Sequence, residues 1–150
     1  MSNWITITKD TLYDASTAAL IDACDTAALA NNQSARSPGL IQGVVDDIRR
    51  KVASCRFNQL DADLTKIPKG LKNIAVTLII AKLKMAVEQD LSEDERREVA
   101  TANANLNRVA SCDDVVDQPD DAADAGMEPT VAPPSFGTRC RHFTDTTQDG

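Results

Sequence analysis

Aromatic side chains are scarce in this chain of 150 residues, which contains one Trp, one Tyr and three Phe. Hydrophobic residues nevertheless make up 42% of the sequence, and Ala, Leu, Ile and Val supply nearly all of them. Alanine and leucine are strong helix formers, whereas β-sheets favour aromatic and β-branched residues. The composition therefore favours helices, and the length fits one domain or one domain with a tail.

The sequence also contains no long hydrophobic run. The longest run, from Ile74 to Ala81, has about eight residues and is interrupted by Thr77, whereas a helix needs roughly twenty apolar residues to span a bilayer. We therefore expect no transmembrane helix and no membrane partner. The first residues, Met1 to Trp4, lack the basic start and the apolar run of a secretory signal. We expect a cytosolic chain whose thiols are reduced.

Closely spaced cysteines are absent as well. Successive cysteines are separated by 31, 57 and 28 positions, and none belongs to a Cys-x-x-Cys pair. The spacing indicates neither a zinc site nor a disulfide framework. The four cysteines are Cys24, Cys55, Cys112 and Cys140.

Residues that could perform catalysis or hold a cofactor are few. The only histidine, His142, lies two positions after Cys140 in a terminal segment, where no rigid scaffold would hold a nucleophile against its base. Asp46 and Asp47 lack the spaced oxygen ligands of a calcium loop, and Gly39 to Gly43 lacks the ending of a phosphate-binding loop. We predict no catalytic residue, no cofactor and no metal, and a protein that is not an enzyme.

The N-terminal part of the chain predicts an entry segment followed by two helices. The run from Trp4 to Thr8 alternates in the manner of a β-strand, and Thr8 can then cap a short helix that ends at Tyr13. From Ser16 to Ala30 an alanine-rich pattern predicts a second helix.

The third predicted helix has the clearest start. Ser37 is a suitable N-cap residue, and Pro38 suits the first helical position. The helix is expected to end near Phe57. Its apolar stripe consists of Leu40, Ile41, Val44, Val45, Ile48, Val52 and Cys55. The opposite, solvent-facing side is expected to carry Asp46, Asp47, Arg49 and Arg50.

Two further helices complete the predicted body. After a polar connection over residues 58–67, Pro68 is expected to open a helix whose middle, Val76 to Ala81, is apolar nearly all round. Such a helix is expected at the centre of the core. Ser92 and Glu95 form a capping box that starts the last helix, which runs to about Ala110 and covers the bundle. We predict an all-α fold, a small bundle of four to five helices.

The net negative charge of the chain comes entirely from its C-terminal part. Residues 1–111 contain 14 basic and 14 acidic residues, whereas residues 112–150 contain 2 basic and 9 acidic ones. An acidic segment with prolines and few apolar residues cannot build its own core. We therefore predict a helical domain over residues 1–111, an acidic extended linker over 112–134 and an anchoring peptide over 135–150.

The order of these parts resembles the head–tail connector, or adaptor, family of tailed phages, including its Mu-like prophage members. The resemblance covers residues 4–111 and rests on the helix beginning Gly39-Leu40-Ile41-Gln42-Gly43, on Ile67-Pro68, and on the helix beginning Leu71-Lys72-Asn73-Ile74. The terminal run Phe136-Gly137-Thr138-Arg139-x-Arg141-x-Phe143-Thr144 is similar to the Arg-x-Arg-aromatic-Ser/Thr end of the Mu-like members.

The resemblance implies a structural virion protein located at the neck, between the capsid portal and the tail, and assembled in the host cytoplasm. About 12 copies would form a ring beneath the portal, extend the channel for genomic DNA and provide the docking surface for the tail. The implied partners are further copies of the chain, the portal protein and a tail-terminator or tail-completion protein, with non-specific proximity to DNA. The residues expected to bind a partner are Phe136, Arg139, Arg141 and Phe143.

A small helical DNA-binding regulatory protein is the alternative interpretation. Basic residues cluster at Arg49, Arg50 and Lys51, with Arg56 nearby, and could contact phosphates. However, residues 1–111 are neutral overall, and the predicted loops are nearer ten residues than the three or four of a helix-turn-helix.

Overall fold

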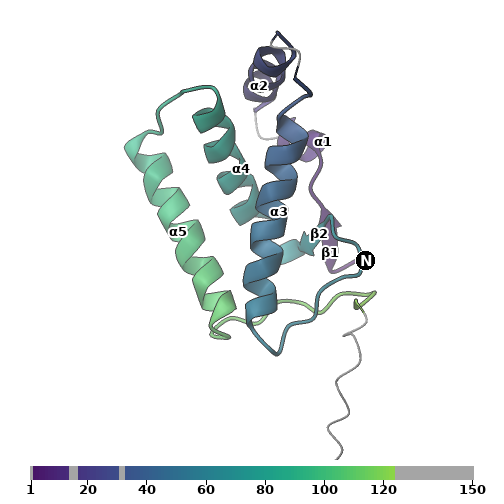
Figure 1. Ribbon diagram of the computed structural model, residues 1–150. Coiled ribbons are helices and arrows are strands. Elements are labelled where there is room, and N and C mark those ends of the chain that lie inside the picture. Colours follow the sequence, from purple (N-terminus) through teal and green to yellow (C-terminus); the bar gives the residue numbers. More distant parts are fainter. Residues whose placement is uncertain (1, 14–16, 31–32, 124–150) are drawn as a thin grey trace, which may run out of the picture.

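The computed structural model describes residues 2–13, 17–30 and 33–123 (Figure 1). It confirms the predicted fold class, because 62% of the described residues are helical and they form five α-helices with only one two-stranded sheet. In chain order the elements are β1 (Trp4–Thr6), α1 (Lys9–Tyr13), α2 (Ala18–Ala30), α3 (Ser37–Ser54), β2 (Lys66–Pro68), a 3₁₀ turn (Lys69–Leu71), α4 (Lys72–Ala86) and α5 (Glu93–Ala110).

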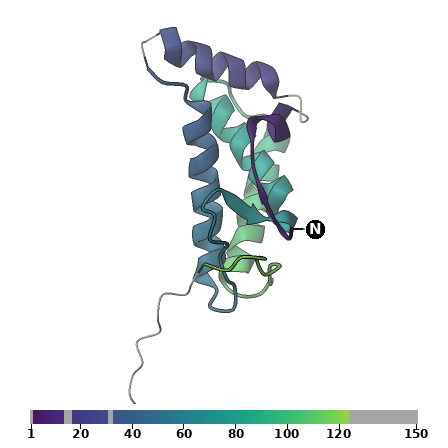
Figure 2. The same ribbon diagram turned by 90° about the vertical axis from the view of Figure 1, so that its right-hand side faces the viewer.

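The three longest helices form the body of the molecule (Figure 1). α3 and α5 run in one direction, and α4 returns in the opposite direction against both of them. α2 crosses the end of the body at which α3 begins, as Figure 2 shows. The small sheet lies beside α3, nearer to its C-terminal end.

The predicted entry strand is present and pairs with a strand that the sequence analysis missed. β1 and β2 are antiparallel, with Ile5 opposite Ile67 and Trp4 opposite Pro68. Pro68 was predicted to open a helix, but its backbone is extended, and α4 begins only at Lys72. Proline has no N–H to donate and is therefore tolerated at the end of an edge strand.

The start of α3 is held by a carboxylate from α2. Ser37 is not the N-cap residue but the first residue of the helix, and both its backbone N–H and its hydroxyl donate to Asp25, at 2.8 Å each. Lys9 of α1 donates to the same carboxylate at 2.7 Å. Burial raises the pKa of Asp25, but the hydrogen bonds from Lys9 and Ser37 outweigh it and hold this pKa below its usual value. Asp25 thus joins the first three helices.

The core lies between α4 and α3, and α3 contributes the larger set of fully buried side chains. The predicted apolar stripe of α3 is confirmed, because Ile41, Val44, Val45, Ile48 and Val52 are buried. α4 contacts α2, α3 and α5, and no residue of its apolar middle, Val76 to Ala81, is exposed. Leu78 and Ile80 are half-buried there. This enclosed position is what the all-round apolar pattern of α4 predicts.

α5 closes the body as expected from its amphipathic pattern. Ala102, Leu106 and Val109 are buried, and the helix contacts both α3 and α4. The predicted capping box is confirmed: the Glu95 N–H donates to Ser92 Oγ at 3.2 Å, and the Ser92 N–H donates to Glu95 Oε2 at 2.9 Å. Glu95 also pairs with Lys84 of α4, which holds the pKa of Glu95 below its usual value.

Candidate functional site

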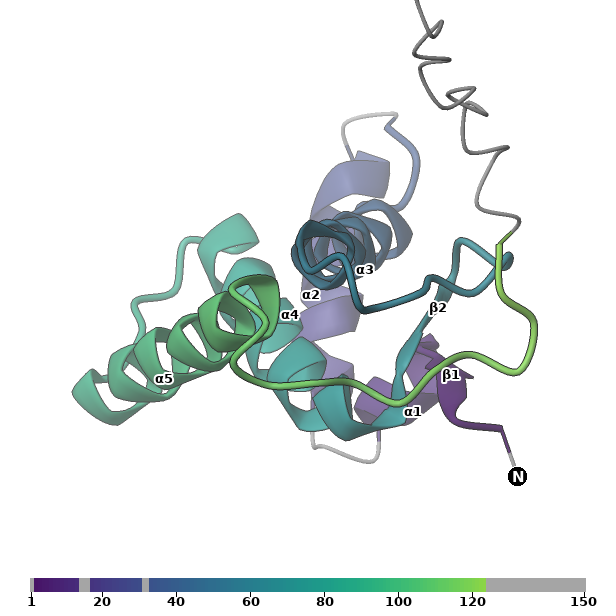
Figure 3. The same cartoon turned by 90° about the horizontal axis from the view of Figure 1, so that it is seen from below.

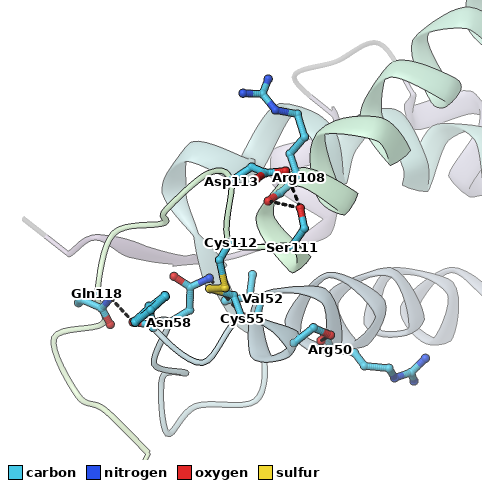
Figure 4. The surroundings of a disulfide bond; sticks show 11 residues. Arg50, Val52, Cys55, Asn58, Arg108, Ser111, Cys112, Asp113 and Gln118 are labelled. Atoms are coloured by element: carbon cyan, nitrogen blue, oxygen red, sulfur yellow. Dashed lines mark hydrogen bonds between the residues drawn. A yellow bond between two sulfur atoms is a disulfide. The ribbon is translucent and has the colours of Figure 1, made fainter.

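A disulfide bond between Cys55 and Cys112 joins the ends of two helices (Figure 4). Cys55 is the C-cap residue of α3, and Cys112 comes directly after Ser111, the C-cap residue of α5. Because α3 and α5 run in the same direction, they end at the same side of the body, and the two Cα atoms lie 5.2 Å apart despite a separation of 57 positions. The prediction of no disulfide and only reduced thiols is therefore wrong, because spacing along the sequence does not reveal which helix ends meet.

The turn at the end of α5 directs the chain onto the body. Cys112 has a φ of 65°, a left-handed conformation that glycine usually occupies at this position. The N–H of Asp113 donates to the carbonyl of Arg108 at 2.9 Å, and the Arg108 guanidinium pairs with Asp114 at 3.2 Å. The turn and the disulfide together fix the path of the residues that follow.

Residues 113–123, which we name the strap, cross the end of the body from α5 toward the small sheet (Figure 3). The indole N–H of Trp4 donates to the carbonyl of Asp117 at 2.9 Å. The side chain of Gln118 accepts from the N–H of Gln59 at 3.1 Å and donates to the carbonyl of Phe57 at 3.2 Å. The strap is thus bound to two segments that lie far from it in the sequence.

The last residues of the strap pair with the loop between α3 and β2. The Ala123 N–H donates to the carbonyl of Leu60 at 2.7 Å, the Ala62 N–H donates to the carbonyl of Asp121 at 3.0 Å, and Asp61 and Ala122 form an antiparallel bridge. Main-chain atoms make these contacts, so the aspartates at 113, 117, 120 and 121 stay exposed. The first part of the predicted linker, residues 113–123, contains no helix and is attached to the helical domain at several points.

Arg49 organises the loop that receives the strap. It was predicted on the solvent-facing side of its helix, but it is buried. Its guanidinium donates to the carbonyls of Asp61, Asp63 and Lys66 at 2.7–2.9 Å and lies 5.6 Å from the centre of the Trp4 ring. The loop folds over the C-terminal half of α3 and so converts an expected surface residue into a buried one.

A groove with a volume of about 340 Å³ opens between α3, α4 and α5. Met85 of α4 is 66% exposed at this groove, and Leu78 is half-buried there. The apolar residues that line the groove are Val44, Leu78, Ala81, Met85, Leu91, Val99 and Leu106. The mostly apolar lining makes the groove a candidate contact surface for an apolar side chain of another molecule or segment.

Basic residues dominate the rim of the groove. Arg50, Lys51 and Lys82 contribute positive charge, and Asp47 contributes one negative charge. Asp47 pairs with Lys82 at 3.1 Å and with Arg50 at 3.4 Å. The rim therefore carries a net positive charge around an apolar floor.

The partner-binding residues predicted from the sequence, Phe136, Arg139, Arg141 and Phe143, lie outside the described residues, as do Cys140 and His142. The sequence analysis missed the disulfide, the strap contacts and the groove. The sequence signal for the groove is the all-round apolar pattern of α4, which places apolar side chains on more than one face of this helix.

Within the described residues, no group of His, Cys, Asp or Glu is arranged to hold a metal ion. No helix of the described part is long and apolar enough to cross a membrane. No protein-family model matches the chain, no curated protein matches it, and no solved structure matches it.

Proposed function

We propose that this chain is a structural subunit of a virion, of the tailed-phage head–tail connector type. Copies of it form a ring beneath the portal that extends the DNA channel and offers a docking surface to the tail. The observation that carries the proposal is the open apolar groove between α3, α4 and α5, because a subunit that assembles with other proteins needs such a surface.

Several charged side chains of the body connect one element to another, which supports a structural role. Arg49 holds a loop through three backbone carbonyls, Asp25 joins three helices, and Lys84 and Glu95 connect α4 to α5. Each of these groups is engaged in holding elements together. The disulfide between Cys55 and Cys112 has the same effect at the other end of the body. A rigid body suits a subunit whose shape must fit its neighbours.

The C-terminal peptide supplies the second part of the proposal. Arginine binds carboxylates with two parallel hydrogen bonds, and phenylalanine fills apolar pockets, so both are effective anchors. Phe136, Arg139, Arg141 and Phe143 would bind the portal or a neighbouring subunit. This step is supported by the resemblance of the terminal motif to Mu-like connectors.

The proposal is tested by affinity purification of the tagged chain from cells that are producing particles, followed by mass spectrometry and electron microscopy. We expect recovery of a portal protein, and loss of that recovery when residues 135–150 are removed from a chain that still folds. Circular dichroism of the shortened chain is the control for folding. Recovery of duplex DNA without virion proteins would contradict the proposal and favour a DNA-binding regulator.

A further inference from the structure

We infer that the groove between α3, α4 and α5 is the docking site for the acidic and apolar C-terminal segment, residues 124–136, of a second copy of this chain. The inference rests on the proposed function, because it supplies a contact between neighbouring subunits. It specifies which surface of one copy receives which segment of the next.

The groove is suited to an apolar segment that also carries negative charge. Its floor contains Leu78 and Met85, and its rim has three cations against one carboxylate. The segment that begins at Asp124 has no basic residue before Arg139, and its charges up to that point are those of Asp124 and Glu128. Its apolar side chains in this stretch include Met127, Val131 and Phe136. The composition of the segment is thus complementary to the groove in both charge and hydrophobicity.

The position of the strap places the start of the segment away from the groove of its own copy, which favours a second copy as the receiver. α5 lies on one side of α3, and the strap leads to the other side, where it ends beside the loop after α3 (Figures 1 and 3). Ala123, its last residue, is fixed there by a hydrogen bond to Leu60. The chain therefore leaves the body on the side of α3 away from the groove.

The contact between the segment of one copy and the groove of the next can be repeated by every copy in an assembly. Each copy offers a segment on one side and a groove on the other, so the contact is heterologous, and such contacts generate closed rings when the rotation between copies permits. A contact between two identical patches would instead stop at a dimer. The geometry thus fits the ring of the proposed function.

The segment is long enough to reach a neighbouring groove. Phe136 follows Ala123 by 13 positions, and an extended chain of that length spans up to about 45 Å. By comparison, the 18 residues of α3 span only about 27 Å at a helical rise of 1.5 Å per residue. The residues between Ala123 and Phe136 are therefore long enough for Phe136 to reach the groove of a neighbouring copy.

Photo-cross-linking of the full-length chain tests the inference. Phe136 is replaced by the photoreactive p-benzoylphenylalanine, and this chain is mixed with the ¹⁵N-labelled natural chain before irradiation and mass spectrometry. We expect cross-links between light and heavy chains at the peptides that contain Met85 or Leu91, which line the groove. Cross-links within one chain only, cross-links to other surfaces, or their absence would overturn the inference.

A matched pair of variants shows whether the groove itself is required. Met85→Asp in the ¹⁵N-labelled chain places a carboxylate in the groove. Leu64→Asp is the control, because Leu64 is similarly exposed but does not line the groove. Both positions are exposed, so both variants are expected to fold. We expect Met85→Asp to reduce the cross-link at least fivefold and Leu64→Asp to leave it unchanged. An equal effect of both variants would overturn the inference.

Electron microscopy of particles separates a failure of this inference from a failure of the proposed function. If the tagged chain is found at particle necks but its Phe136 cross-links avoid the groove, the connector role stands and the docking site is wrong. If the cross-links reach the groove but no virion protein is recovered with the chain, the docking site stands and the connector role is wrong.

Discussion

The indole N–H of Trp4 donates a hydrogen bond of 2.9 Å to the carbonyl of Asp117, a residue 113 positions later in the chain. This bond connects the first strand to the strap that follows the last helix. The bond therefore holds the middle of the strap against the N-terminal strand of the small sheet.

Replacing Trp4 by Phe tests the role of this bond. Trp4→Phe keeps an aromatic ring but removes the donor, and a net loss of about 1 kcal/mol of unfolding free energy is expected for one hydrogen bond. We expect faster hydrogen exchange at the Ala123 amide, which pairs with Leu60 at the end of the strap. The amide of Ile79 in the core is the internal control. Equal acceleration of exchange at both amides would contradict the prediction, because it would mean that the loss of the Trp4 hydrogen bond destabilises the whole body and not the strap in particular.

The disulfide is expected to be a major source of stability. In the chain-entropy description, closing a loop with a separation of 57 positions stabilises a protein by about 4 kcal/mol. Reduction of the natural chain should therefore shift the urea denaturation midpoint to a lower concentration. The double variant Cys55→Ser/Cys112→Ser should show the lower midpoint with or without reductant. A natural chain whose midpoint does not change on reduction would contradict this role.

Arg49 is expected to stabilise the body far more than its neighbour Arg50. Arg49→Ala removes the partner of three loop carbonyls and of the Trp4 ring, and a loss of about 3 kcal/mol is typical for a buried charged group of this kind. Arg50→Ala is the matched control, because its side chain is 77% exposed and surface substitutions change stability by about 0.5 kcal/mol at most. Equal losses in urea denaturation would refute the assignment.

Asp25 is expected to make the stability of the body depend on pH. Hydrogen bonds hold its pKa in the folded chain below the unfolded value, so its contribution is fully present above the unfolded pKa of about 3.9 and is lost as pH falls through the folded pKa. Asp25→Asn removes this contribution and the ion pair with Lys9. The difference in unfolding free energy between the natural chain and this variant should therefore shrink from about pH 5 downward. A difference that stays constant to pH 2 would contradict the prediction.

Local patterns allowed much of the helical body to be predicted. The apolar stripe of α3 and the capping box of Ser92 and Glu95 are interactions between residues close in sequence, and both are confirmed. β2 escaped prediction because it has three residues and becomes a strand only by pairing with β1. A segment so short carries no pattern of its own.

The features that define the candidate site depend on contacts between distant residues. The Cys55–Cys112 bond and the burial of Arg49 arise from the parallel course of α3 and α5 and from the path of a loop. The acidic, proline-containing composition indicated that the residues from 112 onward could not form a core of their own. It did not indicate whether they bind to the core of the helical domain. Gln118 and the main chain of the strap make that attachment without burying its aspartates.

The position of the chain in assembled particles is the most direct measurement of its proposed role. Particles made with a tag at the N-terminus, which leaves the C-terminal anchors free, can be labelled with gold and imaged by electron microscopy. A connector predicts label at the neck between head and tail, together with a ring of subunits beneath the portal. Purified particles that lack the chain, or label spread over the capsid surface, would contradict the assignment.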